Sequence, residues 1–148
     1  GEFDNPNYFN QIKAMSEWEN VDFLGYVPNA EIGEKVYKQA SVGLVLLHKA
    51  PNHTHSIPIK QMEYMQAGLP VIASREVLFC KQVTEEENCG LVVDPLNIDE
   101  VAQAIRIITS DSELAKQMSA NAKQASADKY NWLSQEKSLL EFYQSLFD

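Results

Sequence analysis

Residues 59–74 read IKQMEYMQAGLPVIAS and contain two elements of the fold. The first part has a helical pattern that Gly68 ends, and Pro70–Ala73 is a short apolar stretch typical of a buried strand. Upstream, residues 42–47 read VGLVLL and carry no polar side chain. Strands that are covered on both faces have this composition, and parallel sheets consist of such strands. We therefore expect a helix at about 59–67 between two buried parallel strands.

The rest of the chain continues this alternation and predicts an α/β fold, a Rossmann-like doubly wound parallel sheet. Apolar stretches at 21–24 and 90–93 predict two more strands. Such a domain usually opens with a strand and its glycine-bearing turn. Here the first elements read helix, strand, helix, so we expect the first strand to lie outside residues 1–148. Helices are expected after Pro6, from Asn29 to Ala40, at 77–83, at 98–108, after an Asp111 cap, and at about 131–147.

The length, net charge and cysteine content exclude several classes of protein. The length of 148 residues fits one domain. The formal net charge of −9 argues against binding to nucleic acid or to an anionic membrane surface. The longest apolar run, 42–47, is far shorter than the roughly 20 residues that cross a bilayer. Cys80 and Cys89 are too few for a disulfide scaffold, so we expect both to be reduced and structural, as in a cytoplasmic protein.

Candidate binding residues follow the expected strands, because ligands of open α/β sheets bind beyond the carboxyl ends of the strands. Segments 25–28, 48–58 and 74–76 occupy such positions. The backbone amides of Ser56 to Ile59 would lie at a helix N-terminus, which binds phosphate readily. Glu63 comes about one turn later, where its carboxylate could accept two hydroxyl groups of a ribose.

These residues closely resemble the motif of the group 1 glycosyltransferases (family 4), which lies in the C-terminal, nucleotide-sugar-binding half of the two-domain GT-B fold. The motif matches residues 56–74, and the flanking residues agree in order. Residues 21–27 resemble the family's strand and glycine before the nucleotide base, and 88–105 resemble its later strand and helix. Tyr130-Asn131-Trp132 resembles the aromatic pair before its last helix.

The resemblance implies roles for individual residues. The family pattern has two glutamates eight positions apart. The second matches Glu63, which would hold the ribose hydroxyls of the donor. The first falls at His55, which would face the transferred sugar and is the candidate catalytic residue, with hydrogen bonding and a charge that differ from those of a glutamate. The implied nucleotide-sugar-binding residues are Glu63, Ser56, Ile57, Pro58, Ile59, Lys60, Gly25, Tyr26 and Val27.

The implied function is the donor-binding half of a retaining glycosyltransferase that uses a UDP- or GDP-sugar and needs neither a cofactor nor a bound metal. The acceptor-binding N-terminal domain would be its partner, and residues 1–148 alone would be inactive. Related sequences with this form of the helix tend to act in the assembly of surface polysaccharides, in the cytoplasm, with peripheral membrane association left open. Two alternatives remain: a non-catalytic binding or partner domain of this shape, and half of a nucleotide-sugar 2-epimerase.

Three further groups of residues carry weaker expectations. His48, His53 and His55 form only a poor zinc-ligand set, since no cysteine lies nearby. Arg75 and Glu76 follow a predicted strand, and we favour a helix cap over contact with an acceptor. Most aromatic residues of the last helix are expected in the core, although an uncovered apolar strip is expected either there or near the first helix. These aromatic residues are Trp132, Phe142, Tyr143 and Phe147 at the last helix, and Tyr8 and Phe9 at the first.

Overall fold

The computed structural model describes residues 2–147. In this range the sheet is parallel and has three strands in the order β1-β2-β3, where β1 is Gly43–Val45, β2 is Val71–Ser74 and β3 is Gly90–Val93. The predicted α/β fold with a parallel sheet is confirmed. The helices are α1 (Pro6–Lys13), α2 (Asn29–Lys35), α3 (Pro51–Thr54), α4 (Ile59–Ala67), α5 (Leu78–Glu86), α6 (Ile98–Ser110), α7 (Ser112–Asp128) and α8 (Trp132–Gln144), with short 3₁₀ turns η1 (Ser16–Asn20) and η2 (Tyr37–Gln39).

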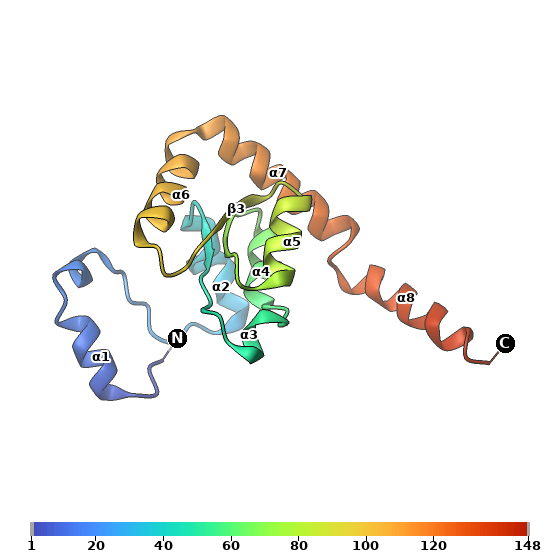
Figure 1. Ribbon diagram of the computed structural model, residues 1–148, viewed down its shortest axis with the longest axis horizontal. Helices are drawn as coiled ribbons and strands as arrows, with labels where there is room; N and C mark the ends of the chain where they lie inside the picture. Colours follow the sequence, from blue (N-terminus) through green and yellow to red (C-terminus); the bar gives the residue numbers. More distant parts are fainter. Residues whose placement is uncertain (1, 148) are drawn as a thin grey trace.

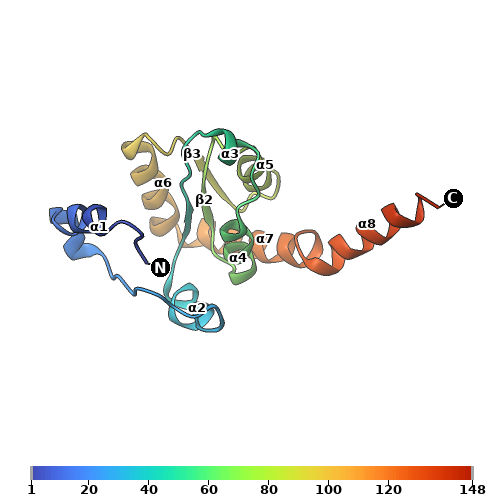
Figure 2. The ribbon, with the colours of Figure 1, turned by 90° about the horizontal axis from the view of Figure 1, so that it is seen from below.

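Helices cover both faces of the sheet. Alternate residues of β2 enter two separate cores: Val71 and Ala73 pack with residues of α4 and α5, whereas Ile72 packs with residues of α6. Figure 2 shows α6 on one side of the strands and α4 and α5 on the other. Helix α7 contributes to both cores, through Ala122 and Met118 respectively. This double winding leaves the carboxyl ends of the strands, and the loops that follow them, free to form a site.

Local signals set the ends of the central helices where the sequence predicts them. Helix α4 ends before Gly68, whose φ of 74° is left-handed and suits a residue without a Cβ. Helix α7 begins after Asp111, whose carboxylate accepts hydrogen bonds from the amides of Glu113 and Leu114. The predicted range of the helix at 59–67 is confirmed.

The predicted strand at Val21–Leu24 is wrong. This segment has no regular secondary structure, and it forms no ladder with any strand of the described residues. A strand exists only by pairing, and β1 pairs on its β2 side alone in residues 2–147. Instead, Phe23 packs against the rings of Phe9 and Trp18, with centroids 5.1 and 5.8 Å away.

Three other predicted ranges also change. The helix from Asn29 ends at Lys35 and is followed by η2, because Val36 has a φ of −120° that an α-helix does not tolerate. The strand expected at 42–47 is shorter, at Gly43–Val45. The loop 48–58 includes the short helix α3.

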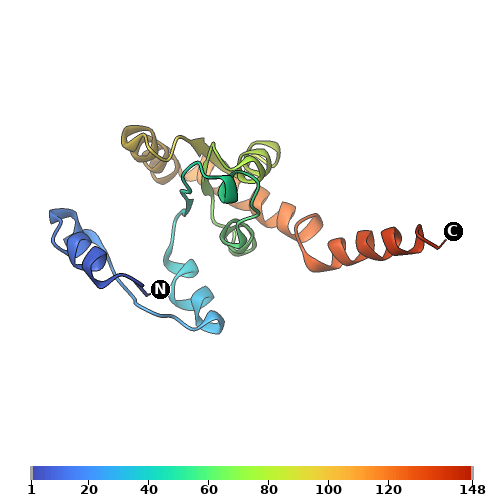
Figure 3. The ribbon, with the colours of Figure 1, turned by 60° about the horizontal axis from the view of Figure 1, so that its bottom comes forward.

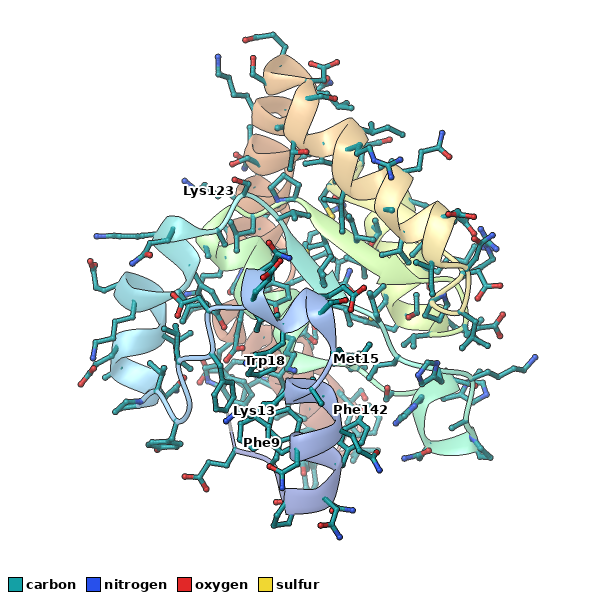
Figure 4. The ribbon with its side chains drawn as sticks, turned by 90° about the vertical axis from the view of Figure 1, so that its left-hand side faces the viewer. Phe9, Lys13, Met15, Trp18, Lys123 and Phe142 are labelled. Atoms are coloured by element: carbon teal, nitrogen blue, oxygen red, sulfur yellow. The ribbon has the colours of Figure 1, made fainter. Side chains whose placement is uncertain are left out.

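The two ends of the chain lie away from the sheet and its covering helices. Figures 1 and 3 show the segment with α1 on one side of the molecule and α8 extending on the other. In Figure 4, Phe9, Lys13, Met15 and Trp18 come from the first segment, and Phe142 comes from α8. None of the aromatic residues expected in the core at the last helix is buried. Trp132, Phe142, Tyr143 and Phe147 are all exposed, so the core prediction is wrong and the uncovered apolar strip is confirmed.

Both cysteines are free and buried, as expected of structural thiols. Burial raises the pKa of Cys80 to about 12 and that of Cys89 to about 11. Both therefore stay protonated near neutral pH, which makes them poor nucleophiles.

Among residues 2–147, no helix combines the length and the apolar character that crossing a membrane requires.

Candidate functional site

A half-buried carboxylate lies on α4, held by a tyrosine from another part of the chain. The hydroxyl of Tyr37, in η2, donates a hydrogen bond of 2.9 Å to Oε2 of Glu63. The Tyr37 ring meets the ring of Tyr64 edge to face, with centroids 5.6 Å apart. Burial, and then the hydrogen bond to the Glu63 carboxylate, raises the pKa of Tyr37 to about 12. The hydroxyl therefore remains a donor throughout the physiological range.

The N-terminus of α4 is open to an anion. Pro58 is its N-cap and makes no side-chain hydrogen bond there, and the first turn has no acidic residue. The amide of Gln61 donates to the carbonyl of Pro58 at 3.1 Å, so it is satisfied within the turn. The other first-turn amides have no partner inside the helix, and the helix dipole adds about half a positive charge at this end. Glu63 lies about 6 Å further along the helix axis, given the rise of an α-helix.

A hollow of about 570 Å³ lies between the end of β1 and the start of α4. Its wall includes Leu44 to Leu47 on one side and Ile57 to Lys60 on the other. Ser74 fixes this end of β1, because its hydroxyl donates to the carbonyl of Val45 at 3.1 Å and accepts from the amide of Leu47 at 2.7 Å. The hollow therefore lies at the carboxyl end of a parallel strand, where the sequence predicts a site.

A second hollow, of about 320 Å³, contains two of the residues expected near the nucleotide base. Tyr26 and Val27 line it, together with Lys35 at the end of α2 and Gln39 at the end of η2. Tyr26 is 71% exposed, so its ring is free to contact a ligand. Gly25 precedes it with a φ of 62°, a left-handed conformation that turns the chain at this point.

Four of the predicted site residues line neither hollow, namely Gly25, His55, Ser56 and Glu63. His55 is exposed at the end of α3. The hydroxyl of Ser56 donates to the carbonyl of His53 at 2.8 Å and so stabilises the loop. His53 itself lies with Nδ1 3.0 Å from the carbonyl oxygen of His48. In residues 2–147, no three His, Cys, Asp or Glu side chains are grouped as a metal site would require.

The cap preference for Arg75 and Glu76 is wrong. Helix α5 has Val77 at its N-cap, with no side-chain hydrogen bond. Arg75 instead pairs with Glu100 of α6, and Glu76 lies 3.6 Å from Nζ of Lys49. The two ion pairs therefore connect the loop after β2 to α6 and to the loop after β1.

The sequence did not predict two residues that shape the site, Tyr37 and Gln61. Tyr37 lies 26 positions before its partner Glu63, so no local pattern connects the two. Gln61 is completely buried, and its amide nitrogen donates to the carbonyl of Cys80 at 3.3 Å and to the hydroxyl of Thr84 at 3.1 Å. It thereby holds α4 against α5. No local signal in the sequence marks Tyr37 or Gln61, because the partners of both side chains lie in other elements.

Comparisons with known sequences agree on the family. A family model described as glycosyl transferases group 1 matches residues 2–125. An uncharacterized glycosyltransferase of Haemophilus influenzae is 26% identical over 122 residues, which are 82% of this chain and 32% of that protein. Another, of Methanocaldococcus jannaschii, is 31% identical over 123 residues, which are 83% of this chain and 30% of that protein. The chain thus spans about a third of the length of these curated relatives.

Comparisons with solved structures agree on the fold. Sucrose-phosphate synthase from Thermosynechococcus elongatus superposes with a TM-score of 0.80 at 24% identity, over 99% of this chain and 36% of that one. The C-terminal domain of a group 1 glycosyl transferase, LpcC, from Francisella tularensis gives a TM-score of 0.68 at 17% identity, over 86% of this chain and 64% of that one. At these identities the likeness shows the fold alone, which is the C-terminal half of a GT-B glycosyltransferase. Together with the family match over residues 2–125, this shows that the chain belongs to the group 1 glycosyltransferases.

Proposed function

We propose that this domain binds the nucleoside-diphosphate sugar that serves as the donor of a retaining glycosyltransferase. The observation that carries the proposal is the arrangement of α4. Its open N-terminus borders a hollow at the end of β1, and the carboxylate of Glu63 lies one turn further along the same helix. A nucleotide has the matching order of groups, with a diphosphate next to a ribose that carries two hydroxyls.

In this proposal each part of the donor has its own partner. The diphosphate accepts hydrogen bonds from the amides at the start of α4, next to the exposed side chain of Lys60. The ribose hydroxyls donate to Glu63, and the base lies against Tyr26 and Val27 in the second hollow. The transferred sugar extends towards the loop of His55, the catalytic candidate, whose exposure leaves it free to move onto a ligand.

The proposed chemistry is electrostatic. The bond between the sugar's anomeric carbon and the diphosphate oxygen breaks, an acceptor hydroxyl forms the new bond to that carbon, and the hydroxyl proton passes to the departing diphosphate. The negative charge that develops on the diphosphate is stabilised by backbone dipoles that are already oriented at the start of α4. No metal or cofactor takes part in the proposed reaction. Because residues 1–148 would hold only the donor side, we propose that transfer needs an N-terminal domain that binds the acceptor and closes the cleft. The exposed apolar residues of α8 are the surface that we assign to contact with that domain.

For the whole protein we propose transfer of a hexose from a UDP- or GDP-sugar, in the synthesis of a surface polysaccharide or glycoconjugate. We also propose that this work takes place in the cytoplasm. Contact with a membrane would then be peripheral.

Calorimetric titration of the domain with UDP, GDP and their sugars tests the proposal. We expect a Glu63→Ala variant to bind the preferred nucleotide about tenfold more weakly or worse, because it loses charge-assisted hydrogen bonds to the ribose. A Glu136→Ala variant is the matched control, since Glu136 is an exposed carboxylate of α8 far along the chain from the site. Equal affinities in Glu63→Ala and the unaltered domain would remove Glu63 from the site.

A second candidate is a domain that binds the donor without catalysing transfer. The observation that favours it is His55, which stands where the family has a carboxylate and does not line the hollow. Incubating the full-length protein with a donor that binds separates the two functions. Release of the nucleoside diphosphate, beyond the rate in the absence of protein, supports the transferase, and binding without release supports the second candidate.

A further inference from the structure

We infer that Tyr37 is a positioning residue for donor recognition, whose hydroxyl fixes the carboxylate of Glu63 so that its second oxygen is presented to the ribose. This inference rests on the proposed function, because it assumes that Glu63 binds the donor. It goes beyond that function by assigning part of the ribose selectivity to a residue that never touches the donor.

The first support is the hydrogen bond itself. Tyr37 donates to Oε2 of Glu63 at 2.9 Å, and among residues 2–147 this hydroxyl is the hydrogen-bond partner that the structure gives the carboxylate. A carboxylate offers about four acceptor positions on two oxygens. One of them is used by Tyr37, which leaves Oε1 and a further position on Oε2 for two ribose hydroxyls.

The second support is the flexibility of glutamate. The last torsion of a glutamate side chain is broad, and a half-exposed carboxylate on a helix samples many orientations. A group that must be ordered on binding loses affinity through that ordering. A carboxylate already held by Tyr37 loses less, so the hydroxyl increases affinity for any ligand that donates two hydrogen bonds to Glu63.

The third support is the way the Tyr37 ring is held. Its edge-to-face contact with Tyr64 keeps it beside α4. Tyr64 in turn lies over Gly43 of β1, where a Cβ would be only 2.3 Å from Cδ2 of the tyrosine ring. Sheet, α4 and η2 are therefore packed in series, and the position of the hydroxyl is set by rigid elements. The raised pKa of Tyr37, caused first by burial, keeps its proton on the oxygen.

The fourth support is the position of η2 between the two parts of the proposed site. Lys35 and Gln39, on either side of Tyr37 in sequence, line the hollow assigned to the base. Tyr37 contacts the residue assigned to the ribose. The same short segment therefore shapes the base hollow and orients the ribose acceptor.

A Tyr37→Phe variant tests the inference, because it removes the hydroxyl and keeps the ring. Calorimetry would compare UDP with 2′-deoxy-UDP, and GDP with 2′-deoxy-GDP, for whichever base binds. We expect Tyr37→Phe to bind the ribonucleotide about three- to tenfold more weakly and the deoxynucleotide almost as well as the unaltered domain does. The preference for ribose over deoxyribose therefore shrinks. A merely structural role would weaken both nucleotides alike.

Two controls make the result specific. Tyr143→Phe removes an exposed hydroxyl on α8 and should leave both affinities unchanged. Adding Tyr37→Phe to a Glu63→Ala variant should have no further effect, because the hydroxyl acts only through the carboxylate.

The outcomes separate the inference from the function on which it rests. If Glu63→Ala removes the ribose preference and Tyr37→Phe leaves it unchanged, the positioning role is overturned and the donor site stands. If the preference falls in both variants and the effects do not add, the inference is supported. If Glu63→Ala changes no affinity, both the ribose site and the inference fail.

Discussion

Gly43 is the residue on which the packing around the site depends most directly. An added Cβ at this position would lie 2.3 and 2.4 Å from ring atoms of Tyr64, well inside van der Waals contact. The ring belongs to α4, immediately after Glu63, and it also supports Tyr37. The absence of a side chain at Gly43 thus allows α4 to lie close enough to the sheet for the site to form.

We expect Gly43→Ala to destabilise the domain by about 1–3 kcal/mol, because the Tyr64 ring must move in a packed core. Urea unfolding followed by circular dichroism measures the change. Gly33→Ala is the matched control, because Gly33 lies in α2 with nothing within 4 Å of the added Cβ. There the substitution should stabilise by about 0.4–1 kcal/mol, since it restricts the unfolded chain. Equal stabilities of the two variants would contradict the packing described here.

At the scale of elements, a capping side chain sets where α7 begins, whereas packing decides how the helix is placed. Helix α7 is the longest helix of residues 2–147 and contributes to the cores on both faces of the sheet. Its first turn depends on the carboxylate of Asp111, which accepts from the amides of Glu113 and Leu114 at 3.1 and 3.0 Å. A weakened start of α7 therefore affects the whole fold.

Asp111→Ala should lower the free energy of unfolding by about 1 kcal/mol, because two first-turn amides lose their acceptor. Asp111→Asn is the control. It keeps a side-chain oxygen at the cap, and asparagine caps about as well as aspartate. Chemical denaturation of the three proteins at one pH gives the comparison. If the free energy of unfolding falls as much in Asp111→Asn as in Asp111→Ala, the charge of Asp111, and not its hydrogen bonding, supports the helix.

At the scale of the whole molecule, α8 stands apart from the rest. It extends from the sheet and its covering helices in all three ribbon views, and its large apolar side chains are exposed (Figures 1, 2 and 3). Such a surface contributes little to the stability of this domain by itself. It is available to a partner, and we have assigned it to the N-terminal domain in the proposed function.

Leu140→Gln should therefore change the free energy of unfolding by less than about 0.5 kcal/mol, as exposed substitutions usually do. Leu140 is 55% exposed on α8. Ile108→Ala is the comparison from the core, where the residue is 1% exposed and its truncation should cost about 2–5 kcal/mol. Urea titration of both variants checks the contrast. A loss in Leu140→Gln that approaches that of Ile108→Ala would show that α8 packs against the domain in solution.

Local sequence signals predicted much of the central fold. Gly68 and Asp111 mark helix ends in the sequence and in the structure, because a left-handed φ and a capping carboxylate act over a few residues. Val21–Leu24 was predicted as a strand and is not one, because strand formation depends on a neighbour that no local pattern contains. Trp132 was expected in the core, yet an aromatic side chain is buried only where other elements cover it. Within residues 2–147, Trp132 lines one side of a hollow with Phe79 and Tyr130 and stays 69% exposed.

The candidate site divides in the same way. Helix geometry places the carboxylate of Glu63 about one turn after Ile59, so the sequence by itself determined that a helix start and an acidic side chain would lie close together. The structure corrects part of the amide group expected at 56–59, because the amide of Ser56 donates to the carbonyl of His53 at 3.0 Å and Pro58 has no amide N–H. Only the sheet places the start of α4 beside the hollow at the end of β1. Only the tertiary structure decided three features of the site: the hydrogen bond from Tyr37 to Glu63, the close approach of Tyr64 to Gly43, and the exposure of His55. Each depends on the distance between residues that are remote in sequence, and that distance is set by packing of the complete core.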